Sequence, residues 1–438
     1  MRFLKWLYPG MKIKRWLLLA TGGVLFFGMG AALLSAQADL VVRASSLIIL
    51  GLGLSALIVG VIETVRSLLD VVSPMPQREL VDLVFQRRHL EKGPKIVAVG
   101  GGTGLSTLLH GLKAYTTNVT AIVTVADDGG SSGRLREEFG MLPPGDIRNC
   151  LVVLADAEPL VQQLFQYRFG QDSALRGHNF GNLFITAMTQ ITGDFARAVQ
   201  ASSRVLAIRG RVIPSTCQTV RLVAEHIDGS VTIGESRISH ATSPIQRVYL
   251  EPAGAMATEE AITAIHDADV IVLGPGSLYT SIIPNLLVEG IAQAIVQSKA
   301  LKLYVCNVMT QHRETTGFKA SDHVRALVAH TNPGIVQVCL VNVKAVPTSV
   351  LEKYRGEEAF PVEPDIDRIR ELGYQVLPDE VINTENVVRH DSDRIAQLII
   401  QLTAGIRRIP TGPLPVVSRP NGVVAKSGAD ADHTAPRP

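Results

Sequence analysis

This sequence has few cysteines and almost no excess of either charge. Each of these two features excludes a class of protein. Only four of its 438 residues are cysteines, and because they are far apart and form no CxxC pair, they argue against a disulfide scaffold or a zinc ribbon and favour a reducing compartment. The 42 lysines and arginines nearly balance the 40 aspartates and glutamates, so the chain lacks the concentrated basic surface of a nucleic-acid-binding protein. Charged residues make up 19% and hydrophobic residues 46%, which excludes a disordered chain and predicts a large buried core.

Several catalytic signatures are missing as well. No lysine follows the first glycine-rich turn as a P-loop requires, and that turn does not have the GxGxxG order of a dinucleotide-binding loop. The nucleophile elbow GxSxG, the metal pair HExxH and any His/Cys cluster are absent from the sequence. The sequence therefore offers no case for hydrolysis by a nucleophilic side chain.

Two uncharged apolar runs, 17–36 and 44–62, lie near the start of the chain. Each is close to the length that a helix needs to cross a hydrocarbon core of ~30 Å. The first run is too long for the core of a signal peptide, and neither run has the polar face of a globular helix. Basic residues precede the first run and Arg66 follows the second, so the positive-inside rule places both ends in the cytoplasm. We therefore predict that residues 1–66 form a hairpin anchor in the cytoplasmic membrane, with both termini and the main domain in the cytoplasm.

Two further segments lie outside the predicted folded domain. Residues 67–94 have the composition of a juxtamembrane linker, with a short amphipathic helix over 79–91. Residues 406–438 are rich in proline, glycine and serine, a composition typical of a disordered tail. The folded domain is thus predicted to cover 95–405.

Short apolar strands alternate with helical segments along this domain. Such strands are typical of a parallel sheet that is covered on both faces. The region 146–207 is rich in helical patterns, and the region 211–250 alternates in period two around Asp228-Gly229, which predicts a small antiparallel element. The predicted fold is a doubly wound α/β domain with a mostly parallel sheet, a helical insertion and this antiparallel element. The expected strands are 95–99, 119–125, 270–273, 301–305 and 336–343, and a helix is expected over 321–330.

Three polar loops follow predicted strands, where an open α/β sheet binds its ligands. Gly100–Gly104 and Gly274–Ile282 each join a strand to a helix, so their backbone N–H groups could hold a phosphate. Asp127–Arg136 adds two acids for sugar hydroxyls or water-bound Mg²⁺, then hydroxyl and guanidinium groups for phosphate oxygens. The alternative to ligand binding is that these segments are only structural turns, a solvated loop or helix caps.

The candidate residues come from these loops and from three other polar segments, 145–149, 178–182 and 307–315. The metal candidates are Asp127 and Asp128, with Mg²⁺ bound through water. The ligand candidates are Gly101, Gly102, Thr103, Gly104, Asp127, Asp128, Ser131, Ser132, Arg134, Arg136, Arg148, Asn149, Asn179, Asn182, Gly274, Gly276, Ser277, Thr280, Ser281, Asn307, Thr310 and Gln311.

Five segments in order resemble the YvcK family of gluconeogenesis factors, within the wider CofD-like group of 2-phospho-L-lactate transferases. They are VGGGTGLSTLL (99–109), ADDGGSSGRLR (126–136), GDIRNCL (145–151), HNFGN (178–182) and GPGSLYTSIIPNLLV (274–288). The resemblance covers about 95–405 and implies a Rossmann-like fold. It further implies binding of a UDP-sugar such as UDP-N-acetylglucosamine, with a role in cell shape and envelope-precursor supply during gluconeogenic growth.

We therefore predict a membrane-tethered regulator that binds a nucleotide sugar and requires no cofactor. Its expected partners are the membrane and an envelope-biosynthesis or amino-sugar enzyme, with homo-oligomers allowed and no nucleic acid. Alternatives are a CofD-like, Mg²⁺-dependent transferase of phospholactyl or nucleotidyl groups, an NAD(P)-binding oxidoreductase, and a channel or receptor whose apolar spans carry the function. Metal-dependent turnover would favour the transferase, and hydride transfer would favour the oxidoreductase.

Overall fold

The computed structural model describes residues 14–35, 39–72, 88–156, 159–170, 172–354, 356, 358–385 and 387–407. The chain divides into two compact units, with a boundary after Arg88. We call 14–72 the hairpin unit and 89–407 the α/β unit. Most of the predicted linker helix (79–91) and nearly all of the predicted tail (406–438) lie outside the described residues, as do the basic residues that precede Lys14.

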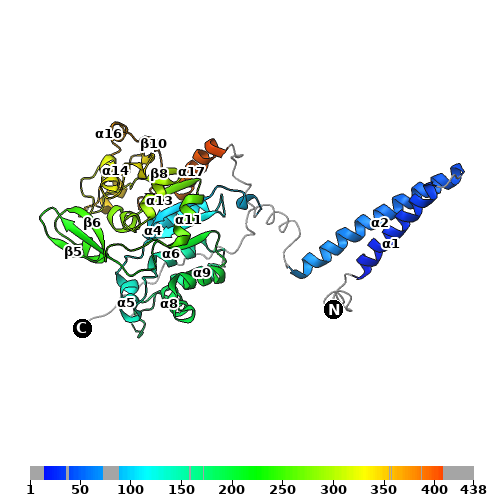
Figure 1. The fold of residues 1–438 in the computed structure, drawn as a ribbon, viewed down its shortest axis with the longest axis horizontal. Helices are drawn as coiled ribbons and strands as arrows, with labels where there is room; N and C mark the ends of the chain where they lie inside the picture. Colours follow the sequence, from blue (N-terminus) through cyan, green and yellow to red (C-terminus); the bar gives the residue numbers. More distant parts are fainter. Residues whose placement is uncertain are drawn as a thin grey trace, which may run out of the picture. The chain divides into compact units, whose positions relative to one another are not determined.

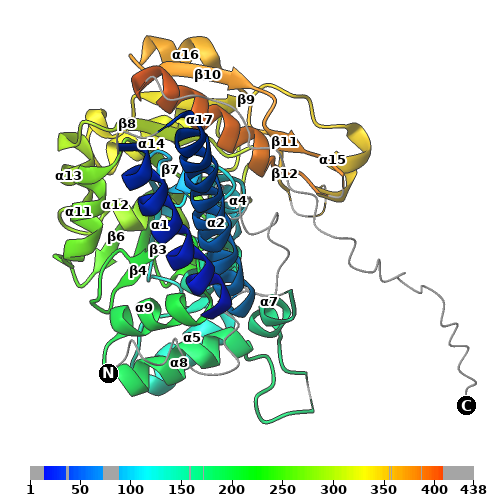
Figure 2. The same cartoon turned by 90° about the vertical axis from the view of Figure 1, so that its right-hand side faces the viewer.

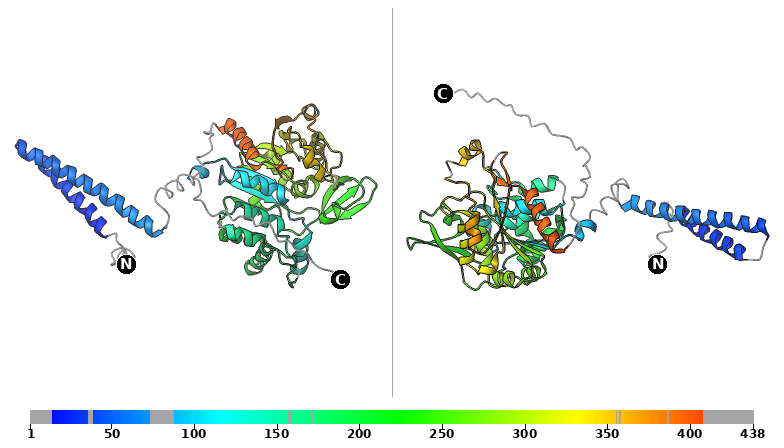
Figure 3. Two further views of the ribbon diagram at one scale, coloured as in Figure 1. Left: turned by 180° about the vertical axis from the view of Figure 1, so that it is seen from behind. Right: turned by 90° about the horizontal axis from the view of Figure 1, so that it is seen from above.

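The hairpin unit consists of the helices α1 (Lys14–Ser35) and α2 (Leu40–Val72), which lie side by side (Figure 3). Both are long and apolar enough to cross a membrane. Glycines let the two backbones touch, since a Cβ atom on Gly23 would lie 2.5 Å from the backbone nitrogen of Leu57. The second helix continues ten residues past the predicted run, because Arg66 pairs with Glu63 one turn earlier and no proline intervenes.

Seven parallel strands form the main sheet of the α/β unit, in the order β10-β9-β8-β7-β1-β2-β3. This arrangement confirms the predicted mostly parallel α/β fold. The strands are β1 (Ile96–Gly100), β2 (Val119–Val123), β3 (Arg211–Pro214), β7 (Val270–Leu273), β8 (Leu301–Val305), β9 (Val338–Asn342) and β10 (Gln375–Asp379).

The chain leaves the centre of this sheet in two directions. From β1 it proceeds to β2 and β3 on one side, and it later returns to β7 and proceeds to β8, β9 and β10 on the other. Right-handed crossovers therefore place the helices of the two halves on opposite faces. Figures 1 and 2 show β10 and α16 at one end of the unit and α8 and α9 at the other. The point where strand order reverses lies between β1 and β7, which is where such sheets bind ligands.

Helical segments surround the sheet of the α/β unit. They are α4 (Gly102–Leu112), α5 (Gly130–Phe139), α6 (Gly145–Leu154), α7 (Pro159–Gln166), α8 (Phe180–Thr192), α9 (Phe195–Val205), α10 (Glu235–Ile238), α11 (Glu259–Asp267), the π-helix η2 (Leu278–Ile282), α12 (Ile283–Leu286), α13 (Ile291–Gln297), α14 (Ala320–Ala329), the 3₁₀-helix η3 (Pro333–Ile335), α15 (Thr348–Tyr354), α16 (Ile366–Glu371) and α17 (Ser392–Arg407).

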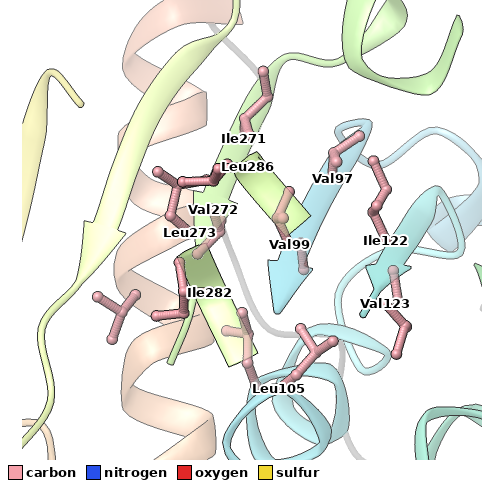
Figure 4. Packing of buried hydrophobic residues seen from close by; sticks show 14 of the residues in the cluster. Val97, Val99, Leu105, Ile122, Val123, Ile271, Val272, Leu273, Ile282 and Leu286 are labelled. Carbon is pink, nitrogen blue, oxygen red and sulfur yellow. The ribbon is translucent and has the colours of Figure 1, made fainter. Parts of the chain in front are cut away.

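The core is deepest around the reversal point. Every residue of β1 is buried, as its continuous apolar sequence predicts. Figure 4 shows Val99 of β1 and Leu273 of β7 close to Leu105 from the first turn of α4 and Ile282 from η2. Both helical segments that follow the glycine loops are therefore anchored by side chains that the solvent does not reach.

The region 211–250 differs from its predicted arrangement. Its first strand, β3, belongs to the parallel sheet, because its apolar residues pair with β2 rather than with the next strand. The antiparallel element is confined to β4 (Arg221–His226), β5 (Val231–Ile233) and β6 (Ile245–Glu251), and the predicted hairpin at Asp228-Gly229 joins β4 to β5. Figures 1 and 3 show β5 and β6 projecting at the edge of the unit. A short ribbon, β11 (Ile382–Asn383) and β12 (Arg389–His390), follows the last strand of the sheet.

Candidate functional site

Two glycine loops meet at the carboxyl ends of β1 and β7. A Cβ atom on Gly104 would lie 2.6 Å from the backbone oxygen of Pro275, and one on Gly276 would lie 3.3 Å from the backbone oxygen of Gly101. A Cβ atom does not fit at the first distance and is tight at the second, so the loops can approach this closely only because position 104 is glycine. The first and third loops, which follow the neighbouring strands β1 and β7, therefore meet at one edge of the sheet.

Helices begin immediately after both loops. The N-cap residue of α4 is Gly101, which has no side chain to cap the helix, and the N–H of Gly102 is bonded to Asp146. The next N–H groups of the first turn, of Thr103 and Gly104, have no side-chain cap and can bind an anion.

The third loop is braced by Asn285, whose Nδ2 donates to the backbone oxygens of Gly100 at 2.9 Å and Ser281 at 2.7 Å. Asn285 is fully buried, and it joins the end of β1 to η2. The sequence analysis did not select this residue.

A pocket of about 460 Å³ opens over the two loops. Ten of the predicted ligand residues line it, which are Gly101, Gly102, Thr103, Gly104, Gly276, Ser277, Thr280, Ser281, Asn307 and Gln311. Its other lining residues are Thr107, Glu235, Ser239, Val308, Met309, Glu314, Tyr354, Val388, Arg389 and His390. The pocket combines backbone N–H donors with hydroxyl and amide groups, a composition suited to a phosphorylated ligand that carries hydroxyls.

Three buried carboxyl groups lie beside the first glycine loop. Burial, followed by the neighbouring charge of Asp127, raises the pKa of Asp146 to about 6, although its carboxylate accepts the N–H of Gly102. Burial also raises the pKa of Asp127 and of Glu235, and their side chains are hydrogen-bonded to each other. A shared proton relieves the repulsion within such a pair. The raised pKa values favour the neutral carboxyl forms, which repel a nearby phosphate less than carboxylates do.

Two other acids hold the site together. Asp128 accepts the backbone N–H of Ser236 at 2.8 Å, which fastens the antiparallel element to the second loop. Glu314 accepts the hydroxyl of Ser277 at 2.6 Å and that of Ser239 at 3.3 Å. Sequence analysis selected Asp128 as a ligand or metal residue, and in the structure one of its oxygens is already engaged by the protein.

The predicted arginines lie outside the pocket lining. The guanidinium of Arg134 donates to the backbone oxygen of Arg176, and that of Arg136 donates to the backbone oxygen of Val220. Arg148 donates to the side-chain oxygens of Asn182 and Asn149. These arginines therefore brace loops around the site, and their predicted contacts to a ligand stay predictions.

The remaining candidates serve as local supports. Asn179 caps α8 by accepting the N–H of Asn182, which is the alternative that the sequence analysis left open. Ser131 accepts the N–H of Asn179, and Ser132 is bonded to Asp127. Thr310 is buried and bonded through both its hydroxyl and its backbone N–H to Phe360. Gly274 has a φ of 79°, so it supplies the turn that places the third loop.

Arg389 is the one residue with a permanent positive charge among the described residues that line the pocket. It comes from β12, next to His390, whose Nε2 lies 3.1 Å from the backbone oxygen of Cys306. Burial lowers the pKa of His390 to about 4, so this imidazole is neutral at physiological pH. No motif in the sequence pointed to Arg389, because only tertiary folding carries β12 to the glycine loops.

A hollow of about 320 Å³ adjoins the pocket and shares Thr103, Thr107 and Arg389 with it. It is lined further by Asn149 and His110, so the predicted residue Asn149 lies at the edge of the same crevice. A larger hollow, of about 840 Å³, lies along β3 and contains none of the predicted ligand residues. The polar groups at the reversal point, rather than volume, therefore define the candidate site.

The described residues contain no group of three or more His, Cys, Asp or Glu side chains arranged to hold a metal ion. Asp127 and Asp128 each have an oxygen engaged by a backbone N–H group, of Gly129 and Ser236 respectively. This donor set does not fit a resident metal. Mg²⁺ bound mainly by water and by phosphates of a ligand, with one carboxylate at its edge, is compatible with the residues present.

Residues 96–382 match the family model described as 2-phospho-L-lactate transferase CofD. The chain belongs to the CofD family. Within it, the chain groups with proteins named gluconeogenesis factor, as the five sequence segments predicted. The gluconeogenesis factor of Bacillus subtilis is 50% identical over 310 residues, covering 70% of this chain and 98% of that protein. The gluconeogenesis factor of Halalkalibacterium halodurans is 49% identical over 311 residues, covering 71% of this chain and 97% of that protein.

A solved structure supports the same assignment of the fold. A crystal structure of a protein from Bacillus halodurans has a TM-score of 0.69 and 49% sequence identity, covering 70% of this chain and all of that one. A relative from Nostoc sp. is 48% identical and covers 92% of this CofD family member and 93% of its own length. The alignment omits 8% of this chain. Even if the whole omitted part lay at the start of the chain, the alignment would still include α2, so the similarity to this relative extends into the hairpin unit.

Proposed function

We propose that this CofD family member is a membrane-tethered regulator that binds a UDP-sugar such as UDP-N-acetylglucosamine. It would regulate the supply of envelope precursors, and thereby cell shape, during growth on gluconeogenic carbon. The observation that carries the proposal is the meeting of two glycine loops over one pocket where the strand order reverses. The name gluconeogenesis factor, borne by relatives about half identical to this chain, supports the metabolic setting.

The diphosphate of the ligand would lie between the two loops. There it would accept hydrogen bonds from the N–H groups of Thr103 and Gly104 at the start of α4, and the guanidinium of Arg389 would balance part of its charge. The raised pKa values of Asp146 and Glu235 reduce the repulsion that two ionised carboxylates would exert on phosphate. The carboxylate of Glu314, which lines the pocket, would accept hydrogen bonds from hydroxyls of the sugar.

Regulation is supported by the way in which the antiparallel element reaches the pocket. Glu235 and Ser239 line the pocket, while Ile233, two residues before Glu235, is exposed on β5. A ligand that contacts Glu235 would thus change the surface offered to a partner, here an enzyme of envelope or amino-sugar synthesis. Association with the membrane is supported by α1 and α2, which have the required length and apolar composition.

Isothermal titration of the full chain in detergent micelles tests the binding proposal. We expect saturable heat with UDP-N-acetylglucosamine and its loss in a variant of the first loop, Gly104→Ala. Absence of heat from the wild-type chain at millimolar ligand would reject the proposal. Fractionation of cells tests the tether, since the full chain should remain in the membrane fraction after carbonate washing and a chain that begins at residue 89 should not.

A transferase is the second candidate, because buried acids beside a phosphate site could hold Mg²⁺ at a reacting phosphate. The family description itself names such an activity. Incubation with a nucleotide-linked substrate, an acceptor and Mg²⁺ would decide between the two candidates. Metal-dependent turnover that Asp127→Asn abolishes favours the enzyme, while ligand binding without turnover favours the regulator.

A further inference from the structure

One end of the pocket has an apolar wall. Val308 and Val388 belong to a small hydrophobic cluster that is separate from the main core, and Met309 and Tyr354 pack against it. All four residues line the pocket. The ring of Tyr354 is held in place, because its hydroxyl accepts the backbone N–H of Val388 at 2.7 Å. This wall therefore offers a fixed apolar surface to a ligand.

The same end contains two buried amide oxygens without a hydrogen-bond partner. They are Oδ1 of Asn307, just after β8, and Oε1 of Gln311, and both residues line the pocket. Gln311 is fixed by a turn in which its backbone N–H donates to the hydroxyl of Thr315 at 2.9 Å. A buried acceptor that lacks a donor destabilises the protein, so a ligand that supplied the donors would gain affinity from these two oxygens.

An apolar wall beside buried acceptors matches a nucleobase better than a sugar. A base has two apolar faces and a polar edge with N–H groups, whereas a sugar carries hydroxyls around its whole ring. The adjoining hollow, lined by Thr107 and Asn149, is polar and suits the sugar. The glycine loops, which would bind the diphosphate, also line this pocket.

We propose that Asn307 and Gln311 determine specificity by binding the polar edge of the uracil ring, while the ring lies against the apolar wall. This inference rests on the proposed binding of a UDP-sugar. The ring N–H of uracil donates to a buried amide oxygen, and an amide nitrogen donates to the adjacent ring carbonyl. Such paired bonds discriminate between bases, because a base with the opposite donor and acceptor pattern leaves them unmade.

Exchanging the amide for a carboxylate tests the proposal. We compare the dissociation constants of UDP and CDP for the full chain in detergent micelles, as wild type and as Asn307→Asp. A carboxylate cannot donate to a uracil carbonyl, but it accepts from the amino group of cytosine. We therefore expect the preference for UDP over CDP to fall by roughly tenfold. The matched control is Asn332→Asp, an exposed cap of η3, which should leave the preference unchanged.

A second variant keeps the test decisive if Asn307→Asp folds poorly. Gln311→Ala should weaken UDP and leave N-acetylglucosamine 1-phosphate, which has no base, at its wild-type affinity in competition. If either variant weakened all these ligands by the same factor, the amides would be contacting phosphate or sugar, and the proposal would be wrong. Failure of the wild-type chain to bind UDP-N-acetylglucosamine would instead reject the proposed function on which this inference rests.

Discussion

The backbone oxygen of Pro275 lies 2.6 Å from the point that a Cβ atom on Gly104 would occupy. These residues are far apart in the sequence, yet they place the ends of β1 and β7 in contact. The carbonyl belongs to the backbone, so it cannot move aside as a flexible side chain could. The distance between the two loops, and with it the width of the pocket, is therefore set by the absence of a side chain at position 104.

Gly104→Ala should separate the two loops. We expect a loss of roughly 1–3 kcal/mol in stability, as is typical of overpacking, together with at least a tenfold loss of affinity for UDP-N-acetylglucosamine. Thermal unfolding and isothermal titration measure the two effects. The matched control is Gly170→Ala, where a Cβ atom meets nothing within 4 Å. Equal behaviour of the two variants would show that the contact does not control the pocket.

Asn285→Ala should lower the free energy of unfolding more than it lowers the affinity for the ligand. It removes the donor that serves the backbone oxygens of Gly100 and Ser281, and the site is too buried for water to replace it freely. The loss of these two buried hydrogen bonds costs about 1–3 kcal/mol, which urea unfolding can measure. Gln375→Ala, on the exposed side of β10, is the control and should change stability by less than about 0.5 kcal/mol. A stability loss at Asn285 no greater than at Gln375 would contradict the bracing role.

Arg389→Ala should reduce affinity for the diphosphate by about tenfold or more, because it removes a charge-assisted hydrogen-bond donor from the pocket. The loss should shrink as salt concentration rises, since salt screens an exposed charge. Titrations at two ionic strengths measure both effects. Arg368→Ala, in an exposed pair with Glu371 on α16, should leave binding unaltered. An affinity for UDP-sugar that does not depend on Arg389 would place the phosphates elsewhere.

Binding should also depend on pH. Burial raises the pKa of Asp146 to about 6 and raises that of Glu235, and a bound phosphate would raise both further. Binding should therefore take up protons, and affinity should fall as pH rises from 5 to 7 while Asp146 ionises. Titrations in buffers of different ionisation enthalpy detect the proton uptake. Asp146→Asn should flatten the fall, and an unchanged pH profile in this variant would assign the dependence to another group.

The same shift has a consequence for stability. The folded-state pKa of Asp146 lies above its unfolded value of 3.8, so the protein gains from protonation and loses stability as pH rises through about 4 to 6. Asp146→Asn should therefore become relatively more stable than wild type at neutral pH. Urea unfolding of both proteins at pH 4 and pH 7 measures the change, and a constant difference between them would contradict it.

Much of the architecture could be predicted because it depends on local sequence. The strands Val270–Leu273 and Leu301–Val305 are continuous apolar runs that end at glycine or polar residues, and the structure has them at the predicted bounds. The glycine loops could be placed at one edge because parallel strands end together. Strand β3 could not be assigned, since nothing in Arg211–Pro214 says whether its partner is β2 or β4.

The acids and the cation of the pocket were harder to predict. Glu235 enters through an antiparallel element that pairs only with itself, and Arg389 enters through a ribbon after the last strand. Neither residue stands in a motif, and each reaches the loops only through contacts between distant parts of the chain. Asp127 and Asp128 were conspicuous in sequence, but the structure shows that backbone N–H groups already engage both.

The ribbon of β11 and β12 follows the last strand of the sheet in the chain, so the pocket is completed only after all strands of the sheet have been made. A chain that stopped at Asp379 would contain all seven strands of the main sheet but would lack Val388 and Arg389. The two glycine loops would then lie over an open edge, without one wall and without the permanent cation. A nascent chain could thus form its whole sheet before it gained a closed crevice, which would separate folding of the sheet from capture of a ligand in time.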